Sequence, residues 1–400
     1  MPAASQASPS RLAIPVIYGA GLCQGLAFVL IPALGNVLKS APYSLSNGAY
    51  GTLFLPETLG AIGSAVVAGR VAERFGLAGL FRLGLLANLG ALALLMGSAL
   101  KAGSTLSYLL LLAETACLGM GFGLTLAAVN DAATLLFADR ASAAVTVLNA
   151  LIGGGTAISP LLLDVLAARG YWWAWPLLVF LGFALAAAAS ATIAGVSARG
   201  AKAPPRATRV PARLWWFAAA VAVYAICEGT FGSWASIFVH TDRGGSQAAG
   251  AWALSAFWGA MTLARVAFGL STTWLAPRRV YALSPLAIAA AFVIVSFVHG
   301  VGALIALFAA AGVACSYFFP FSMSFAIEEN SAERARASGL LVAALMLGEG
   351  IGSYALGPLQ GPHRLTLSLI YRGSALWGVA LFVIALALMR TSTSSARFAA

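Results

Sequence analysis

From Leu214 to Val239 the chain reads LWWFAAAVAVYAICEGTFGSWASIFV, an apolar stretch of 26 residues with one charged side chain, Glu228. About 20 apolar residues suffice for a helix to cross the hydrocarbon core of a bilayer, so this stretch predicts a membrane-spanning helix. A charge at the centre of such a helix costs about 2.5–3.5 kcal/mol on insertion scales, and it therefore faces protein or a water-filled cavity. Glu228, flanked by glycines at 229 and 232, is thus a candidate functional residue.

The composition of the whole chain is that of a polytopic membrane protein. Apolar residues make up 61% of its 400 residues and charged residues only 9%, with a mean hydropathy of +0.91. A soluble chain has about 25% charged residues. The net charge of +11 comes from basic residues scattered singly or in pairs between apolar runs, whereas a nucleic-acid-binding surface needs them clustered. We therefore expect a lipid bilayer, and no nucleic acid, among the partners.

Sequence motifs for catalysis or cofactor binding are not found in the loops. There is no phosphate-binding loop, nucleophile elbow or metal-ligand spacing, so we expect neither an enzyme nor a bound cofactor. The four cysteines are far apart within apolar runs and form no C-x-x-C pair, which indicates neither a disulfide framework nor a zinc site. We expect no signal peptide, because the first apolar run is long enough to span and lacks a cleavage site.

Twelve apolar runs of about 20 residues or more predict an all-α membrane protein with twelve transmembrane helices. The polar segment 197–213, rich in arginine and proline, divides them into six plus six. We therefore predict an N-terminal six-helix half over 1–196, a cytoplasmic linker over 197–213 and a C-terminal six-helix half over 214–400. The runs begin near Leu12, Asn47, Gly79, Leu106, Ala141, Trp172, Leu214, Ala248, Val280, Val301, Ala337 and Ser368.

Basic residues between the runs are shared unevenly between the two sides of the membrane. With both termini placed inside, sixteen are cytoplasmic and six are outside, which is a strong positive-inside bias. We predict a multi-pass protein of the bacterial inner membrane, monomeric, with both termini in the cytoplasm. The six outer residues are Lys39, Lys101, Arg169, Arg243, Arg364 and Arg372.

The two predicted halves repeat each other. The tripeptide at 23–25, Cys-Gln-Gly, matches Cys-Glu-Gly at 227–229, and Arg-Ala-Ser at 140–142 matches Arg-Ala-Ser at 336–338. The matches keep their order and a nearly constant offset, which favours duplicated halves around a site at the membrane midplane. Gln24 occupies the repeat position of Glu228, so we expect the two side chains to face one another across a cavity.

The loop between the second and third runs reads Gly69-Arg70-Val-Ala-Glu73-Arg74-Phe-Gly76. It resembles the G-x-x-x-D-R-x-G loop of the major facilitator superfamily of transporters, with glutamate in place of aspartate. Together with the twelve runs, the basic linker and the repeat, the resemblance extends over essentially the whole chain. It implies the major facilitator fold of two pseudo-symmetric six-helix halves, and it places Gly69, Glu73, Arg74 and Gly76 in the gate.

Asp131 and Arg140 are the other predicted gating residues. Asp131 falls near the end of the fourth run, and Arg140 directly precedes the fifth. We predict a cytoplasmic latch from Asp131 to Arg70 or Arg74. Breaking such a latch when the two halves rock would bias the inward-facing and outward-facing states.

Within the superfamily, the chain resembles the fucose-permease-like branch of sugar:proton symporters. That branch has a glutamate four residues before the asparagine that Asn130 resembles, and here Leu126 stands at that position. The proton-coupling residue of the branch is therefore not carried over. The resemblance rests on Asn130, Glu228-Gly229-x-x-x-x-Trp234, Trp258 and Arg265-x-x-x-Gly269.

Four carboxylates within the apolar runs are candidates for proton coupling. Coupling needs a carboxylate that is desolvated enough to bind a proton near neutral pH and whose proton affinity changes when the cavity switches sides. At a rise of about 1.5 Å per residue, Glu57, Glu228 and Glu349 fall near the midplane and Glu114 falls in the outer half. The alternative is a neutral carboxyl that fixes helix packing or, for Glu57 after Pro56, one that satisfies backbone groups freed by a kink.

Arg265 is the only cation deep within the runs, so we expect it to pair with a carboxylate. Either it binds an anionic substrate or releases a proton from Glu228, or it forms a structural pair near the cytoplasmic mouth. Four acids against one arginine favour proton uptake or a cationic substrate. Aromatic faces with amide partners suit a small polar organic solute. The candidate solute ligands are Gln24, Asn130, Asn149, Tyr224, Trp234, Trp258, Arg265 and Tyr317.

These patterns predict a secondary active transporter that moves a small solute across the inner membrane by alternating access, coupled to protons. A proton-driven drug or metabolite exporter is an alternative, because Gly155-x-x-x-Ser159-Pro160 resembles the G-x-x-x-G-P element of proton antiporters with serine for glycine. A substrate sensor or scaffold on a transporter fold is another. A third is a copper importer, since thiolates select Cu(I), and its ligands would be Cys23, Cys117, Cys227 and Cys315.

Overall fold

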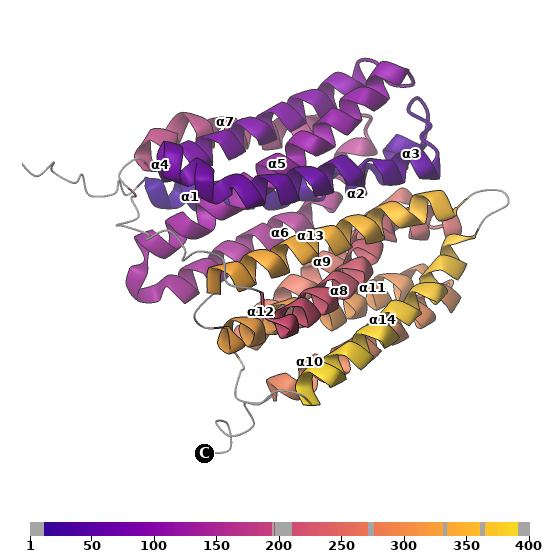
Figure 1. The fold of residues 1–400 in the computed structure, drawn as a ribbon. Helices are drawn as coiled ribbons and strands as arrows, with labels where there is room; N and C mark the ends of the chain where they lie inside the picture. Colours follow the sequence, from indigo (N-terminus) through magenta and orange to yellow (C-terminus); the bar gives the residue numbers. More distant parts are fainter. Residues whose placement is uncertain are drawn as a thin grey trace, which may run out of the picture. The chain divides into compact units, whose positions relative to one another are not determined.

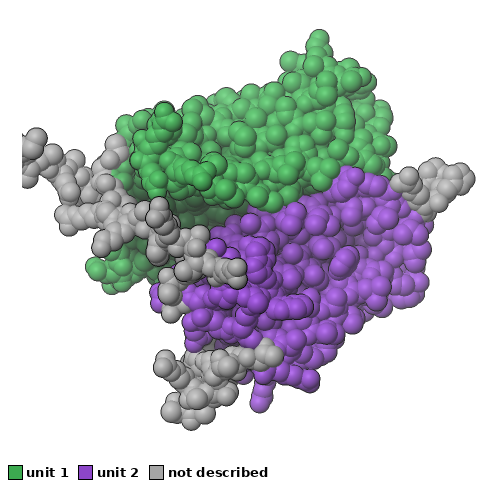
Figure 2. All heavy atoms as spheres, in the orientation of Figure 1, with its two compact units in different colours: residues 1–207 green, residues 208–400 purple. Residues whose placement is uncertain are grey.

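The computed structural model describes residues 12–193, 196, 210–270, 276–330, 334–360 and 365–390, and in these every regular element is a helix (Figure 1). The chain divides into two compact units, Met1–Ala207 and Thr208–Ala400, here called unit 1 and unit 2 (Figure 2). The predicted linker over 197–213 lies outside the described residues except for 210–213.

Unit 1 is built of helices that satisfy their own backbone groups, because apolar side chains and lipid offer none of the hydrogen bonds that water would. Ser46 and Ser104 start two of them by accepting bonds from the backbone N–H of Ala49 and Ser107, which otherwise have no partner within the helix. The helices are α1 (Ala13–Phe28), α2 (Leu30–Lys39), α3 (Asn47–Thr52), α4 (Phe54–Ala99), α5 (Thr105–Leu136), α6 (Ala141–Ala167) and α7 (Ala174–Ala188), with the short turns η1 (Ala138–Arg140) and η2 (Ala189–Ile193).

Unit 2 has the same kind of architecture. The apolar stretch from Leu214 to Val239 lies mostly in α8 (Ala212–Ile237), which continues into a π-helical turn, η3 (Phe238–Asp242). The other helices are α9 (Gln247–Leu270), α10 (Pro277–Phe297), α11 (Val301–Cys315), α12 (Phe318–Glu329), α13 (Arg334–Leu359) and α14 (Leu367–Arg390).

Eleven helical segments among the described residues are long and apolar enough to cross a membrane, where the sequence predicts twelve runs. The difference lies in the segment Asn47–Ala99, whose 53 residues are more than twice the length that a crossing needs. Within it Gly76 has φ 70° and ψ 174°, a backbone conformation that glycine adopts readily and other residues rarely do. The helix is therefore interrupted at the last glycine of the loop 69–76.

Prolines interrupt two further spans. Pro32 has no N–H for the carbonyl of Phe28, and α1 ends there before α2 begins. Pro320 likewise has no N–H for the carbonyl of Ser316, and α11 ends before α12 at this point. A proline removes one bond of the helical ladder and leaves a carbonyl that needs another donor.

Glycines bring α8 and α13 of unit 2 into direct backbone contact. A Cβ atom at Gly352 would overlap the carbonyl of Ile226, and a Cβ at Gly229 would overlap the carbonyl of Glu349. Small residues allow helices to pack closely inside a membrane, where water supplies no hydrophobic driving force. The position of Glu228 is consequently set by the contact at its neighbour Gly229.

The same arrangement recurs in unit 1 between α1 and α6. Gly25 faces the carbonyl of Ile152, and Gly155 faces the carbonyl of Leu22, each too closely for a side chain. Gly25 stands at the position equivalent to Gly229 in the sequence repeat, and Gly155 precedes Gly352 by 352 − 155 = 197 residues, close to the 336 − 140 = 196 residues between the two Arg-Ala-Ser strings. The two units thus use the same close helix pairing.

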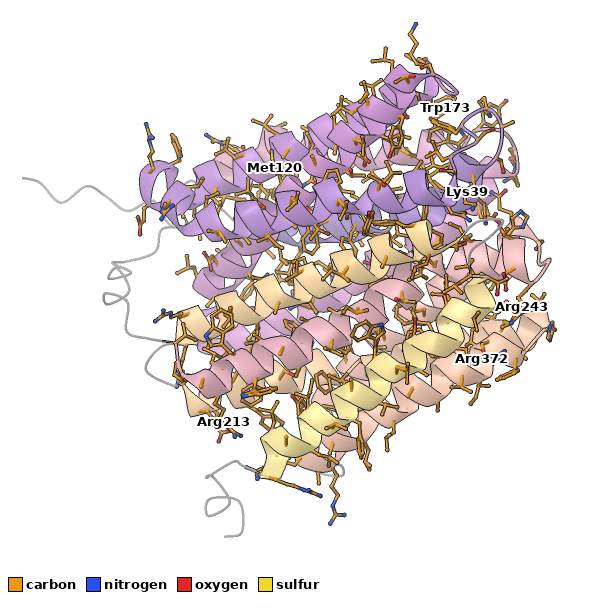
Figure 3. The ribbon with its side chains drawn as sticks, turned by 45° about the vertical axis from the view of Figure 1, so that its right-hand side comes forward. Lys39, Met120, Trp173, Arg213, Arg243 and Arg372 are labelled. Atoms are coloured by element: carbon orange, nitrogen blue, oxygen red, sulfur yellow. The ribbon has the colours of Figure 1, made fainter. Side chains whose placement is uncertain are left out.

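Arginine side chains form polar networks at both ends of unit 2. Arg213, at the start of α8, donates to Glu329 and, at 2.7 Å, to the carbonyl of Leu388. Arg243 lies at the opposite end of this unit, together with Arg372 (Figure 3). Arg213 was predicted for the inner side and the other two for the outer side, so the two sets lie at opposite ends of the helices.

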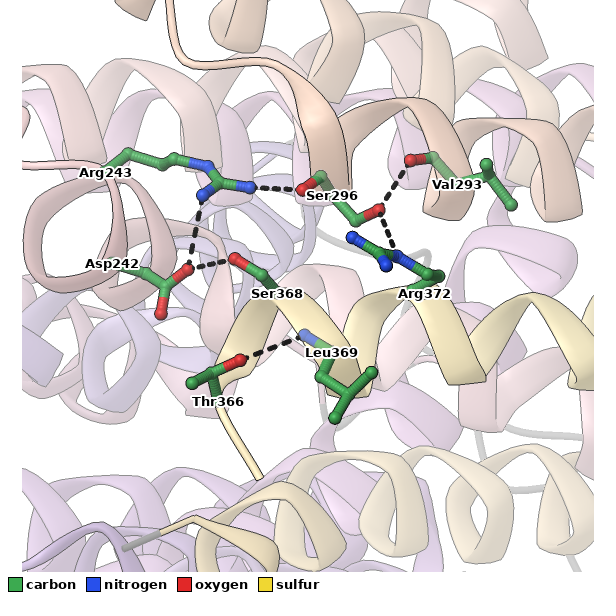
Figure 4. A network of polar contacts seen from close by, with 8 residues as sticks. All are labelled: Asp242, Arg243, Val293, Ser296, Thr366, Ser368, Leu369 and Arg372. Atoms are coloured by element: carbon green, nitrogen blue, oxygen red, sulfur yellow. Dashed lines mark hydrogen bonds and ion pairs between the residues drawn. The ribbon is translucent and has the colours of Figure 1, made fainter. Parts of the chain in front are cut away.

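The network around Arg243 joins η3, α10 and α14 (Figure 4). Arg243 is 3.6 Å from Asp242 and donates to the carbonyl of Ser296. Asp242 accepts a hydrogen bond from Ser368, and Arg372 donates to the hydroxyl of Ser296 at 3.5 Å. These charges lie at the helix ends, which leaves the middle of unit 2 to aromatic rings and one ion pair.

The contact between α8 and α13 gives a first testable prediction. Gly352→Ala is expected to lower stability by about 1–3 kcal/mol, because the added methyl group has to displace the backbone of Ile226. Gly339→Ala on the same helix is the control, since a Cβ there would meet nothing within 4 Å. Thermal unfolding of the purified proteins measures both. An equal midpoint for the two variants would contradict a direct α8–α13 contact.

Candidate functional site

An ion pair lies in the middle of unit 2. The Oε1 atom of Glu228 on α8 is 3.5 Å from Nη2 of Arg265 on α9, and the Glu228 side chain is only 7% exposed. Among the described residues it is the one ion pair of unit 2 away from the helix ends. Arg265 is 39% exposed, so the pair has one enclosed member and one accessible member.

Arg265 also holds the break between α11 and α12. Its Nε atom donates to the carbonyl of Ser316 at 3.1 Å, the carbonyl that Pro320 leaves without a backbone donor. One guanidinium thus joins the carboxylate of α8 to the broken helix. A planar guanidinium suits this role because its five donors point in fixed directions.

Tyr224, one helical turn before Glu228, forms a hydrogen bond at the same break. Its hydroxyl donates to the carbonyl of Cys315 at 2.7 Å, and its ring stacks on Phe318 with centroids 5.4 Å apart. Tyr281 of α10 covers the other side of Phe318 at 4.4 Å. Tyr224 and Glu228 share a face of α8 because residues four apart lie above one another.

Two predicted solute ligands of α8 are enclosed. Tyr224 and Trp234 are both fully buried, and the indole of Trp234 donates to the carbonyl of Ser353 at 2.8 Å. A buried hydroxyl or indole N–H normally requires such a partner. Both side chains make packing and hydrogen-bond contacts in this structure, and their contact with a solute stays a prediction.

Gln24 lies in a hydrogen-bonded network of unit 1. It is fully buried, and its amide pairs with that of Asn88 on α4: Asn88 Nδ2 donates to Gln24 Oε1 at 2.9 Å, with the reverse bond at 3.4 Å. Asn88 also donates to Thr125 on α5 at 3.1 Å. Gln24 is thus part of an amide network inside unit 1, and its expected position facing Glu228 across a cavity stays a prediction.

The sequence analysis missed Asn88. The available signal was an amide alone in an apolar run, which has to find a partner within the protein. Pairing it with Gln24 required knowing which faces of α1 and α4 meet. Asn88 also lies against Gly121, where a Cβ would approach its side-chain amide to 2.6 Å.

The remaining predicted ligands differ in exposure. Asn130 and Asn149 donate to the carbonyls of Leu126 and Val145 in their own helices, and Asn149 is exposed. Trp258 is 9% exposed, and its ring fills the space that Gly232 leaves open. Tyr317 is half-buried at the α11–α12 break, with its ring 5.0 Å from that of Phe268. Of this group Tyr317 lies beside the carbonyls that Arg265 and Tyr224 bind.

The other predicted acids lie in two places. Glu349 is half-buried on α13, where its carbonyl faces Gly229. Glu57 is half-buried on α4, and Glu114 on α5 is fully buried. Neither carboxylate oxygen of Glu114 has a hydrogen-bond partner among the described residues.

The predicted cytoplasmic latch is not formed. None of the ion pairs among the described residues joins Asp131 to Arg70 or Arg74, and all three side chains are exposed. Arg74 lies instead over the ring of Phe75 at 5.3 Å. The exposed side chains are hydrated, so nothing compels them to pair. Gly69, Glu73 and Arg140 are exposed as well, and Gly76 interrupts the helix.

The cysteines do not assemble a metal site within the described residues. All four are free thiols, with Cys227 and Cys315 buried and Cys23 and Cys117 half-buried. No group of three or more His, Cys, Asp or Glu side chains in the described ranges could hold a metal ion. Free cysteine behaves there as a small buried hydrophobe.

Solved transporter structures share the fold of this chain. The nucleoside transporter NupG, in a mutant form, has a TM-score of 0.72 at 15% identity and covers 94% of this chain and 99% of its own. The E. coli fucose:proton symporter FucP has a TM-score of 0.62 at 16% identity, with 95% and 99% covered. The POT family transporter PepTSo has a TM-score of 0.76 at 10% identity, with 96% and 98% covered.

FucP is a major facilitator superfamily transporter, and the likeness shows that this chain has the major facilitator fold. The resemblance drawn from the loop 69–76 and the repeat is thereby confirmed at the level of fold. No family model and no curated protein sequence matches the chain.

The amide network of unit 1 gives the second prediction. Asn88→Ala is expected to destabilise the protein by about 1–3 kcal/mol, because it leaves the buried amide of Gln24 without a partner. Asn149→Ala is the control: Asn149 is exposed and bonds only its own helix, so its loss should stay within about 0.5 kcal/mol. Thermal unfolding measures the difference, and similar midpoints for both variants would rule out a structural role for the network.

Proposed function

We propose that this protein is a secondary active transporter that carries a small polar solute across the inner membrane, coupled to protons through Glu228. The observation that carries the proposal is the ion pair between enclosed Glu228 and accessible Arg265. An ionisable side chain inside a membrane span is rare and marks ion or proton pathways. The major facilitator fold supports transport as the setting for this pair.

Proton binding at Glu228 changes what Arg265 contacts. With Glu228 charged, the guanidinium is shared between the carboxylate and the Ser316 carbonyl. When Glu228 takes up a proton, the attraction between the two side chains is lost, and Arg265 is free to offer its donors to a solute. Arg265 still holds the α11–α12 break through Nε, so proton uptake is linked to the segment most able to bend.

The transport cycle is alternating access between two six-helix halves. Twelve crossings result when Asn47–Ala99 is counted as two, because its length exceeds two spans and Gly76 interrupts it. Both termini are then on one side, which the positive-inside bias assigns to the cytoplasm. The protein works as a monomer, with the halves over 1–196 and 214–400.

The solute is a neutral polar molecule that accepts hydrogen bonds. Arg265 supplies donors, and half-buried Tyr317 supplies aromatic surface at the break. The nucleoside transporter NupG and the fucose:proton symporter FucP share the fold, which supports hydroxyl-rich solutes as the first class to test. Asn130 and Asn149 extend this set from unit 1, and Glu349 remains a candidate for assisting Glu228.

Replacing the coupling carboxylate gives the third prediction. Glu228→Gln should abolish accumulation driven by a pH gradient while exchange of labelled for unlabelled solute continues, because a neutral amide cannot release a proton. The solute is first chosen by a thermal-shift screen of sugars and nucleosides, since a ligand of the folded state raises its stability. Uptake into proteoliposomes measures both processes.

The matched control is Glu328→Gln, a neutralised carboxylate that is exposed at the end of α12. It should keep both accumulation and exchange. Full accumulation by Glu228→Gln would refute coupling at this residue. Loss of both processes, with the fold intact by thermal unfolding, would assign Glu228 to solute binding instead.

A further inference from the structure

Two arginines meet at the end of unit 2 that is opposite Arg213. Arg243 directly follows η3, and Arg372 lies in the second turn of α14 (Figure 3). Both guanidinium groups bond to Ser296, near the end of α10: Arg243 donates to its carbonyl, and Arg372 donates to its hydroxyl at 3.5 Å (Figure 4). One serine thus holds two positive charges side by side.

The π-helical turn η3 directs Arg243 into the unit. The backbone N–H of Arg243 donates to the carbonyl of Phe238, five residues earlier, at 3.2 Å, and the guanidinium lies over the Phe238 ring at 4.8 Å. The side chain is only 7% exposed. Turns of this kind are rare and occur frequently at functional sites. The enclosed position of this cation therefore follows from an unusual backbone.

The two guanidinium groups have donors that the described residues do not use. The Nε atom of Arg243 is buried and has no hydrogen-bond partner there. Arg372 makes a single hydrogen bond within the described part of the chain, the one to Ser296. A guanidinium has five N–H donors, and a buried donor without an acceptor is costly. What this pair of arginines lacks is a set of acceptor oxygens.

The charges of the network are also unbalanced. Asp242 is its one acid among the described residues; the carboxylate is 3.6 Å from Arg243 and also accepts a hydrogen bond from Ser368. Two arginines against one carboxylate leave one positive charge. Because like charges repel, a ligand with a single net negative charge would stabilise the network.

The surface beside Arg372 is apolar. Its guanidinium lies over the ring of Phe297 at 4.0 Å, and that ring is 56% exposed. Exposed Leu376 follows Arg372 by one turn of α14, and exposed Val293 precedes Phe297 by one turn of α10, so each pair shares a face of its helix. The two helices pack against each other. The charged helix ends are thus continuous with an exposed apolar strip, made of Val293, Phe297 and Leu376.

We propose that Arg243 and Arg372 bind the phosphate group of an anionic phospholipid, whose acyl chains cover this apolar strip. Guanidinium groups bind phosphate oxygens through paired N–H···O bonds. Basic pockets between membrane helices bind anionic headgroups, and the ends of membrane spans lie at the level of these headgroups. A headgroup with one net negative charge balances the network and leaves Asp242 in place beside Arg243.

A lipid is favoured over a soluble phosphate as the source of the group. The apolar strip adds nothing to the binding of inorganic phosphate, whereas it gives acyl chains a surface next to the charges. The positive-inside bias assigns this end of unit 2 to the outer side, where arginine is less common, so two arginines in one network there call for a specific partner. The inference does not depend on proton coupling at Glu228, since lipid binding is measured without any solute.

Native mass spectrometry of the purified protein in detergent tests the site. Titration with phosphatidylglycerol gives the Kd of the first lipid bound, and phosphatidylcholine with the same acyl chains, whose headgroup is neutral overall, is the control lipid. We expect Arg372→Gln to weaken binding of phosphatidylglycerol about tenfold, as for the loss of one charge-assisted hydrogen bond, and to leave binding of phosphatidylcholine unchanged. Arg372 is chosen because its side chain is exposed.

The matched control is Arg390→Gln, which removes an exposed arginine at the opposite end of the same helix. It should keep the wild-type affinity for phosphatidylglycerol. Wild-type affinity in Arg372→Gln would overturn the site, and so would an equal loss in both variants, which would indicate attraction by net charge alone. If Arg372→Gln does not fold, Arg372→Lys decides in its place: it keeps the charge but not the planar pair of donors, and an unchanged affinity would overturn the site.

Thermal unfolding separates the lipid from a soluble anion. Phosphatidylglycerol should raise the unfolding midpoint of the wild-type protein more than that of Arg372→Gln, because a ligand of the folded state stabilises it. Inorganic phosphate at the same concentration should raise neither. A rise with inorganic phosphate that equals the rise with lipid, and that is lost in Arg372→Gln, would assign the two arginines to a soluble anion and refute the lipid.

Discussion

Direct backbone contact between paired helices is the constraint on which the rest of this structure depends. In each unit a glycine follows the key polar residue of one helix and faces a carbonyl of the partner helix: Gly25 faces Ile152, and Gly229 faces Glu349. Such contacts leave no room for rotation or sliding, since a side chain at either glycine would overlap backbone. The preceding residues, Gln24 and Glu228, are therefore held in fixed directions. The helix contact positions both residues in addition to their own hydrogen bonds and ion pairs.

The two units use one packing scheme for different polar chemistry. Gln24 and Glu228 occupy equivalent positions, yet the first closes a neutral amide network with Asn88, and the second pairs with Arg265. The contact of α4 with α5 at Gly119 has its counterpart in unit 2 at Gly312, which faces the carbonyl of Phe257. Phe257 thus stands where unit 1 has Glu57. The helix packing is repeated in the two units, while the charged residues are not.

Much of the fold was predictable because it follows from hydropathy and from the few glycines and prolines that interrupt helices. The spans, the interruption at Gly76 and the pairing of Arg265 with a carboxylate all follow from the sequence, since an isolated charge in an apolar run has few options. The rotation of each helix about its axis was not predictable. It decides that Gln24 and Trp234 face inward, and that Asn88 meets Gln24. Pro320 was visible in the sequence, but the donor that reaches the Ser316 carbonyl, Arg265, comes from a helix far away along the chain.

The ion pair of unit 2 links three helical segments through one side chain. If Glu228 carries the coupling proton as proposed, loss of that proton places a negative charge beside Arg265, and the resulting ion pair attracts α8 to α9. Because Arg265 also donates to the Ser316 carbonyl, the same attraction extends to the α11–α12 break. In unit 1 the equivalent position is taken by Gln24, which has no charge to gain or lose and is hydrogen-bonded to Asn88. A change of protonation at this repeat position therefore acts on the helix contacts of unit 2 alone.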